Sequence, residues 1–348
     1  MLLGRWLFMG REFRSVRHNG LTVFLAVGLA PIWCGNHVPA ALMDLRVFQG
    51  MCDASAVEGL DETRFVVAND EDNRLRVYDW TRPGLPLREI NLRPFLPADW
   101  GKAEMDLEGV ARLGEDLYWI SSHGRKAAGE PAPQRQGLLR IPRSWFLQGI
   151  PVRDRLPLCT RLLDGLLADA RFAALGLEEA ANRAPKAAGG LNIEALAAGP
   201  DRSLWIGFRN PVLQGRALMV RLLNPGDVVT GATPRFGSPV LLDLSGHGLR
   251  GAVEWGKGYL LIAGPTGDGE TFRLYAWSGD PAAAPQLLHQ YDFRGLNPEG
   301  ITIWPGKNPP RLWMVSDDGN RQVEGQACKN APMPQRSFRA WSIEAPSD

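Results

Sequence analysis

The 348-residue chain is 45% hydrophobic and 22% charged, with a formal net charge of +1. This composition is typical of a globular protein and excludes an intrinsically disordered chain. The balance of acidic and basic residues indicates no nucleic-acid or anionic-membrane partner. Glycine (39), proline (27) and tryptophan (12) are all frequent, which suits many short strands joined by tight turns.

Residues 1–40 are typical of an export signal. Four arginines precede an apolar run of 13 residues at 21–33. The small residues at 38–40 then form a possible cleavage site after Ala40. The alternative is a membrane anchor, but a span needs roughly 20 apolar residues. We therefore predict a signal peptide at 1–40 and a periplasmic or secreted protein without a stable membrane span after cleavage. The domain that remains, 41–348, has a net charge of −2.

A unit that opens with a Glu-Gly pair recurs along this domain. A short apolar stretch, a turn and a second apolar stretch with a polar tip follow each time. The copies begin at Glu58, Glu108, Glu194, Arg250 and Glu299, so that arginine replaces glutamate in the fourth copy. In the third, Ala195 replaces glycine. A unit repeated at roughly 50 residues is typical of a β-propeller.

A third alternating stretch follows the polar tip of each unit, and a fourth follows a proline-rich turn in three of the copies. In the first copy these are 75–80 and, after a proline-rich turn, 87–92, which makes four antiparallel strands. Residues 45–48 resemble the outer strands, and 337–343 resemble a third strand of the last unit. We expect both ends of the domain to share one sheet and close the ring. The prediction is an all-β β-propeller of five four-stranded blades, with six as the alternative count.

The long interval between the second and third copies holds extra sequence. It measures 86 residues, against 49 to 56 elsewhere. Apolar residues recur at helical spacing near 161–182, within an insertion at about 154–190. We predict a small helical insertion in or after blade two, and a degenerate sixth blade is the alternative.

The cysteines permit one disulfide. Cys34 falls in the predicted signal, which leaves Cys52, Cys159 and Cys328. An oxidising compartment would permit one bond and one free thiol, and we expect Cys159 to pair with Cys328 because both lie in predicted loops. The spacings fit no zinc site.

The repeated opening residues are expected to converge. The first strand of each propeller blade lines the central channel, so these side chains should meet at one mouth. Carboxylates this close raise one another's pKa and need compensation. Backbone N–H groups or arginines would make them structural, whereas a calcium or magnesium ion would make a subset ligands. The candidate metal ligands are Glu58, Asp70, Glu108, Glu194 and Glu299.

The tips after the second strands should crowd the same mouth. His123 is a candidate general acid or base, and Arg125, Arg209 and Arg250 are candidates to hold an anionic group. The candidate ligand-binding residues are Asn210, His247, Asp268, Asp317 and Asp318. In the simpler alternative, the acidic and amide residues form turns and the two histidines are hydrogen-bonded loop residues.

Several catalytic motifs are absent from the sequence. It contains no Gly-x-Ser-x-Gly elbow, no His-Glu-x-x-His, no phosphate-binding glycine loop before a helix and no Rossmann fingerprint. No nucleotide cofactor is expected.

Six short motifs resemble a bacterial family catalogued as domain of unknown function 3616. They stand at 52–56, 70–73, 106–109, 122–125, 207–211 and 297–300, and the resemblance runs from about Met51 to Asp318. That family has no established activity. More distantly, the Glu-Gly starts resemble propeller phytases, phytase-like esterases and gluconolactonase-type propellers. In the last group a glutamate opening the first blade helps to ligate a divalent metal, and the resemblance implies this role for Glu58.

These features together predict an exported, metal-assisted hydrolase of phosphate or carboxylic esters, with a lactonase-like enzyme as a variant. We expect a monomer that acts on a small molecule or glycan. The alternative is a non-enzymatic propeller that binds a ligand or protein in the cell envelope.

Overall fold

The computed structural model describes residues 43–150, 155–289 and 291–346, which belong to one unit, His37–Asp348. The predicted signal at 1–40, with Cys34, lies outside the described residues. Among the residues that are described, no helix has the length and apolar character needed to cross a membrane.

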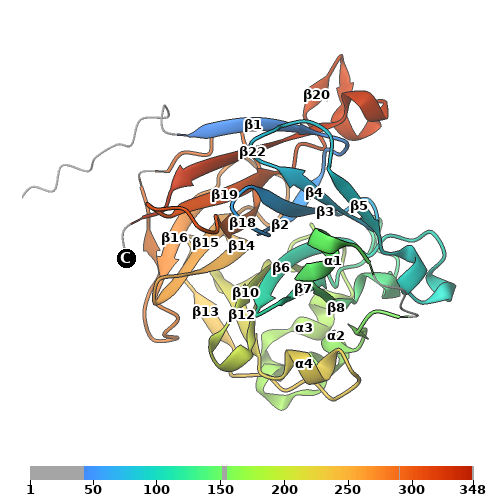
Figure 1. Cartoon of the computed structure of the whole chain (residues 1–348). Coiled ribbons are helices and arrows are strands. Elements are labelled where there is room, and N and C mark those ends of the chain that lie inside the picture. The colour runs from blue at the N-terminus through green and yellow to red at the C-terminus, as the bar shows by residue number, and fades with distance from the viewer. Residues whose placement is uncertain (1–42, 151–154, 290, 347–348) are drawn as a thin grey trace, which may run out of the picture. The chain divides into compact units, whose positions relative to one another are not determined.

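Five sheets of four antiparallel strands make up the described chain (Figure 1). The first comprises β2 (Ala54–Gly59), β3 (Arg64–Asn69), β4 (Arg74–Asp79) and β5 (Arg88–Asn91), and the second β6 (Leu107–Leu113), β7 (Asp116–Ser121), β8 (Leu138–Pro142) and β9 (Leu158–Cys159). The third comprises β10 (Asn192–Ala198), β11 (Leu204–Leu213), β12 (Arg216–Leu222) and β13 (Val240–Leu242), and the fourth β14 (Gly248–Trp255), β15 (Gly258–Gly264), β16 (Arg273–Trp277) and β17 (Gln286–Leu287). The all-β, four-stranded prediction is confirmed.

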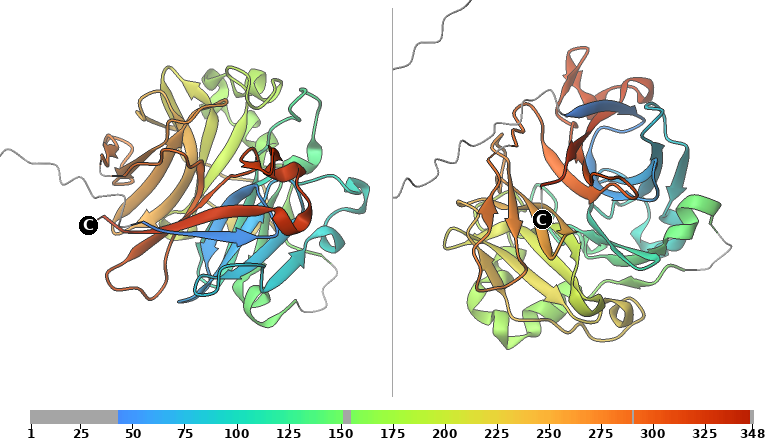
Figure 2. Two further views of the ribbon diagram at one scale, coloured as in Figure 1. Left: turned by 90° about the horizontal axis from the view of Figure 1, so that it is seen from above. Right: turned by 60° about the vertical axis from the view of Figure 1, so that its left-hand side comes forward.

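The fifth sheet joins the two ends of the domain. It comprises β18 (Pro298–Ile303), β19 (Arg311–Ser316), β22 (Ser337–Glu344) and β1 (Asp44–Gln49), and a hairpin of β20 (Gln322–Val323) and β21 (Gln326–Ala327) lies between β19 and β22 in the chain. Strand β1 pairs with β22 in antiparallel register, with Leu45 opposite Trp341. Figures 1 and 2 show the blue and red strands side by side.

The first strands of successive sheets touch one another. Strand β2 contacts β6, β6 contacts β10, β10 contacts β14, β14 contacts β18, and β18 contacts β2. Aromatic side chains fill the wedge between the first and fifth sheets, where Trp304 and Trp313 stack with ring centres 4.2 Å apart. Large apolar rings suit such wedges because each one buries a large area in a single side chain.

Helices are short and lie between the strands. They are α1 (Arg143–Gln148), α2 (Leu162–Ala168), α3 (Leu177–Ala181) and α4 (Pro225–Val228), with 3₁₀ turns η2 (Arg93–Phe95), η3 (Ala98–Trp100), η4 (Pro133–Arg135), η5 (Ala170–Leu175), η6 (Pro200–Arg202), η7 (Cys328–Asn330) and η8 (Met333–Gln335). Helices α2, η5 and α3 lie between β9 and β10, where the helical insertion was expected. Leu162, Leu163 and Leu166 of α2 pack onto the core beside Ile193 and Phe208.

A β-bulge recurs at one place in every sheet. The pairing of first and second strands shifts register at Glu108 in β6, at Glu194 in β10, at Arg250 in β14 and at Glu299 in β18. In β2 the shift falls at Ser55. Since a bulge turns a side chain out of the regular alternation, these five residues are the structural equivalents.

The expected place of Glu58 among these residues is therefore wrong. It lies three residues beyond Ser55, near the end of β2, and accepts a hydrogen bond from Thr302 Oγ1 at 3.2 Å. The distance in sequence from Glu58 to the second strand already indicates that it is not the equivalent residue. Only six residues separate Glu58 from the start of β3, against nine from Ser55 and eight to twelve in the other four sheets.

The disulfide also differs from the expectation. Cys52 pairs with Cys328, with Cα atoms 5.9 Å apart, and Cys159 is a buried free thiol in β9. The partner of Cys328 is decided by the docking of the β20–β21 segment against the start of β2, where the Asp318 N–H donates to the Cys52 carbonyl at 2.9 Å. Cys159, in the fourth strand of the second sheet, has no part in that contact.

We expect Glu58→Gln to change the pH dependence of stability. Burial raises the pKa of Glu58 from 4.5 to about 7, against the opposing hydrogen bond from Thr302. A raised carboxyl pKa stabilises the fold only while the group stays protonated, so this contribution is lost as pH rises from about 4.5 to 7. The variant should gain about 3 kcal/mol relative to the parent between these limits, since each pKa unit between 4.5 and about 7 corresponds to about 1.4 kcal/mol.

Urea unfolding at several pH values measures this difference. The control is Glu254→Gln, which removes an exposed carboxylate and should keep a constant difference from the parent at every pH. A Glu58→Gln difference that does not change with pH would contradict the assignment.

The Cys52–Cys328 bond should appear as a cross-linked peptide in non-reducing digests. Cys159→Ser should keep this peptide, and Cys52→Ser should lose it. The double variant Cys52→Ser, Cys328→Ser should lose ~2–5 kcal/mol of unfolding free energy, because the bond closes a loop that spans 276 residues. A peptide that links Cys159 to Cys328 would contradict the pairing.

Candidate functional site

A polar pocket of about 710 Å³ opens at the ends of the sheets where the first strands begin. Its lining includes twelve acidic and seven basic residues, so it carries an excess of five negative charges. No histidine, serine, cysteine or tyrosine lines it within the described ranges. Such a lining favours a cationic occupant.

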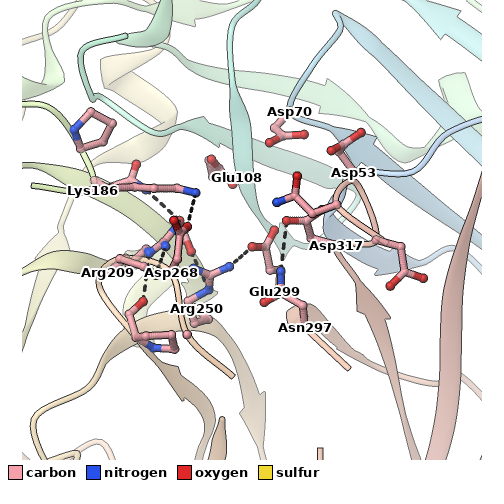
Figure 3. A pocket seen from close by; sticks show the side chains of 18 of the residues that line it. Asp53, Asp70, Glu108, Lys186, Arg209, Arg250, Asp268, Asn297, Glu299 and Asp317 are labelled. Atoms are coloured by element: carbon pink, nitrogen blue, oxygen red, sulfur yellow. Dashed lines mark hydrogen bonds and ion pairs between the residues drawn. The ribbon is translucent and has the colours of Figure 1, made fainter. Parts of the chain in front are cut away.

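One side of the pocket is a buried ion-pair network. Arg250 Nε lies 2.9 Å from Glu194 Oε2, and the same guanidinium pairs with Glu299 (Figure 3). Arg209 Nη1 donates to Glu194 Oε1 at 2.7 Å, and the other Arg209 nitrogens donate to the Pro265 and Gly267 carbonyls. Because these guanidinium groups already neutralise glutamates, they do not provide free charge for an anionic substrate.

The opposite side holds carboxylates with too few cations. Asp70 follows β3, Asp106 precedes β6, and Glu108 is the bulged residue of β6. One oxygen from each of the three lies within 4.8 Å of the others. Asp106 pairs with Arg135 at 3.0 Å. Glu108 is only 8% exposed and forms no hydrogen bond or ion pair within the described chain, and Asp70 Oδ1 is likewise buried without a partner.

The pKa values of these three carboxyl groups are raised because the groups are buried and their negative charges are not fully balanced by nearby cations. Burial, followed by the charges of Glu194, Asp106 and Asp70, raises the pKa of Glu108 well above its ordinary value. Burial, followed by Asp317 and Asp53, does the same for Asp70. Burial raises the pKa of Asp106 to about 6, although Arg135 opposes the rise. Each group would bind a metal in competition with a proton.

The donor set fits a hard divalent cation. Arg135 pairs with Glu104 as well as with Asp106, so the three carboxylates, Glu104 and this guanidinium sum to a formal charge of −3, most of which one divalent ion would neutralise. Calcium and magnesium prefer oxygen ligands of this kind, whereas zinc and copper sites are rich in histidine and cysteine. An ion would also complete the coordination of Glu108 and of Asp70 Oδ1, which no protein donor satisfies.

Nine of the fourteen predicted site residues line the pocket. They are Asp70, Glu108, Glu194, Arg209, Arg250, Asp268, Glu299, Asp317 and Asp318. Two of these are also held by cations, since Asp268 pairs with Lys186 at 2.8 Å and Asp318 pairs with Arg339 at 2.6 Å. The structure does not bring Glu58, His123, Arg125, Asn210 or His247 into the lining.

His123 cannot shuttle protons in this pocket, and that expectation is wrong. The chain turns at His123 with φ 56°, and the buried ring borders a small apolar cavity beside Leu162 and Phe208. Its Nδ1 bonds the Ser121 carbonyl at 2.8 Å. Burial lowers the pKa of His123 to about 4, so the ring is neutral at pH 7.

The predicted residues Arg125, Asn210 and His247 do not line the pocket but hydrogen-bond the loops around it. Arg125 donates to Ala181 O at 2.9 Å and to Asn182 Oδ1, which ties its loop to the helical insertion. Asn210 Nδ2 donates to the carbonyls of Pro185 and Ala187 and so fixes a segment of the wall. His247 Nδ1 bonds the Leu244 carbonyl at 3.1 Å. These three act as hydrogen-bonded loop residues.

One pocket position that four of the five sheets share was not among the residues predicted from the sequence. Two residues before the bulge, Asp53, Asp106, Asn192 and Asn297 all line the pocket. An alignment of the repeats on this Asp or Asn would have found the four residues. It would also have matched Ser55, rather than Glu58, with the opening residues of the other repeats. No such signal exists for Glu104 and Lys186, which reach the pocket from loops, or for Arg135, which reaches it from the 3₁₀ turn η4.

Comparison with solved structures finds several of similar chain trace. Glutaminyl cyclase of Myxococcus xanthus is 13% identical over 87% of this chain and 95% of its own, with a TM-score of 0.42. The allergen Mala s 1 of Malassezia sympodialis is 9% identical over 87% and 98%, with a TM-score of 0.48. The arabinanase Arb43A of Bacillus subtilis is 12% identical over 86% and 95%, with a TM-score of 0.45. We draw nothing about function from these values.

No curated protein sequence matches the chain. Residues 159–324 match the model of the family described as Protein of unknown function (DUF3616), which confirms the resemblance over that part of the chain.

Proposed function

We propose that the five sheets are the blades of a closed five-bladed propeller and that the pocket at its mouth is a divalent-cation site that hydrolyses uncharged carboxylic esters or lactones. The cycle of contacts from β2 through β6, β10, β14 and β18 back to β2 supports the closed ring. The shared sheet of β1 and β22 supports it as well, because pairing the two ends removes an open edge.

The observation that carries the cation site is the group of Asp70, Asp106 and Glu108. Their ligand oxygens lie within 4.8 Å of one another, and Glu108 has no protein partner in the described chain although it is almost fully buried. Leaving an ionised carboxylate buried and unpaired is costly. A calcium or magnesium ion would remove that cost and supply Lewis-acid polarisation of an ester carbonyl.

The charge of the pocket narrows the substrate class. One divalent ion still leaves the lining negative, and Arg209 and Arg250 are already engaged by glutamates. A phosphate ester would meet net repulsion here, whereas an uncharged carboxylic ester or lactone would not.

The lining residues also indicate how hydrolysis would proceed. Because the described lining contains no serine or cysteine, water is the nucleophile, and carboxylates are the available proton acceptors. Arg250 holds Glu194 and Glu299 in place beside the site through its two ion pairs.

The disulfide is consistent with an exported protein. Bonds such as Cys52–Cys328 form and persist in oxidising compartments, which supports the proposal of an export signal at 1–40 and a periplasmic or secreted location.

Calcium or magnesium should raise the melting temperature of the purified protein, and chelation should lower it. An ion present at a thousandfold excess over its Kd stabilises by about 4 kcal/mol. Glu108→Gln should abolish most of this gain because it removes one of three anionic ligands. Asp268→Asn is the matched control, since it removes an exposed carboxylate from the same pocket and should keep the gain. Equal melting temperatures with and without ion in the parent would rule out the site.

Hydrolysis of uncharged acyl esters and lactones should depend on the same ion. We expect turnover to fall at least about tenfold on chelation and in Glu108→Gln, consistent with a loss of about 1.4 kcal/mol or more of transition-state stabilisation. Phosphate esters should be poor substrates. Tight ion binding without turnover of any ester would instead favour a non-enzymatic, cation-dependent binding propeller.

A further inference from the structure

A second pair of carboxylates lies beside the first group. Asp53 precedes β2 and Asp317 follows β19, and the two residues form an antiparallel backbone bridge that joins the first and fifth sheets. The Asp317 N–H also donates to the Asn297 carbonyl at 2.9 Å. Figure 3 shows both side chains on the same side of the pocket, next to Asp70.

The carboxylate oxygens of this pair point to one place. An added Cβ on Gly319 would overlap Asp53 Oδ1 and lie 3.2 Å from Asp317 Oδ1. Because both oxygens lie close to this one point, their separation is within about 5 Å, the span of two oxygens that share one calcium ion. Only glycine leaves room for the two carboxylates to approach in this way.

Protein groups do not neutralise the pair. Asp53 is 6% exposed, and its carboxylate makes no hydrogen bond or ion pair with any described residue. Asp317 accepts hydrogen bonds from the Gly319 N–H at 2.9 Å and Asn297 Nδ2 at 3.1 Å, but forms no ion pair with a described residue. The nearby Lys329 is engaged by Glu71 at 3.2 Å. Among the described residues, neither carboxylate of the pair therefore has a cation in direct contact.

Neither aspartate of the pair has an oxygen within 4.8 Å of all three carboxylates of the first group. The three oxygens of Asp70, Asp106 and Glu108 form a complete set within 4.8 Å, and neither Asp53 nor Asp317 belongs to it. The oxygens of one calcium ion lie at 2.3–2.6 Å from it and so within about 5 Å of one another, which favours a separate ion for a pair outside that set.

We propose that Asp53 and Asp317 hold a second divalent cation, calcium or magnesium, beside the ion of Asp70, Asp106 and Glu108. This inference rests on the proposed function, whose single ion it extends to a two-ion centre. Figure 3 shows Asp70 between Glu108 and Asp53. Two adjacent ions can hold a carbonyl oxygen and the attacking water at the same time.

Calorimetric titration of the full chain with calcium, after removal of bound metal, tests the stoichiometry. We expect two ions per chain in the parent, one in Asp53→Asn and one in Glu108→Gln. Gly319→Ala should also bind one, because its Cβ displaces Asp53 without changing any charge. The matched controls are Asp268→Asn and Gly267→Ala, which alter the same pocket and should keep two ions; the nearest atom to an added Cβ on Gly267 is 3.6 Å away.

The possible failures are distinguishable. One ion in the parent that Asp53→Asn retains and Glu108→Gln loses would overturn the second site and leave the proposed function intact, and two ions in Asp53→Asn would also overturn it. No ion in the parent would overturn both. If the variants do not fold, manganese in the parent gives an independent result. Spin coupling between two manganese ions supports the centre, and a spectrum of isolated ions at saturation overturns it.

Discussion

Buried carboxylates must be neutralised, and this constraint organises the mouth of the five sheets. Where arginine is available, the glutamates form buried pairs, as Glu194 does with Arg209 and Arg250. The replacement of glutamate by Arg250 in the fourth sheet is what makes this network possible, since it places one cation between two anionic neighbours. On the other side Arg135 pairs with Asp106, and Glu108 forms no ion pair in the described chain. The asymmetry between these two sides gives the pocket its proposed chemistry.

The bulges explain how five different sheets deliver charge to one place. A residue at a bulge leaves the alternation of the strand, so its side chain can turn toward the pocket while its neighbours stay in the core. Glu108, Glu194 and Arg250 occupy this position, whereas Ser55 occupies it in the first sheet and bonds the Leu107 carbonyl instead. Glu58, buried farther along β2, belongs to a different environment.

The disulfide and the shared fifth sheet hold this arrangement together. Cys52 is directly followed by Asp53, and Cys328 is directly followed by Lys329, so the bond anchors two pocket residues at once. The β1–β22 pairing joins segments from the two ends of the described chain. Non-local links of this kind reduce the freedom of the unfolded chain and keep like charges close in the folded one.

The sequence by itself determined the strands, the repeat and nine of the residues that line the pocket. Alternating apolar stretches and polar tips depend on local periodicity, so the four-stranded sheets and residues such as Asp70, Asp317 and Glu108 could be predicted. Only the tertiary structure decided which charge each carboxylate meets, that His123 turns into an apolar cavity, and that Cys328 meets Cys52. It also decided the register that separates Glu58 from Ser55. The reason is physical: bulge positions depend on cross-strand hydrogen bonds, and loop contacts such as Arg135 with Asp106 join residues whose proximity no local pattern records.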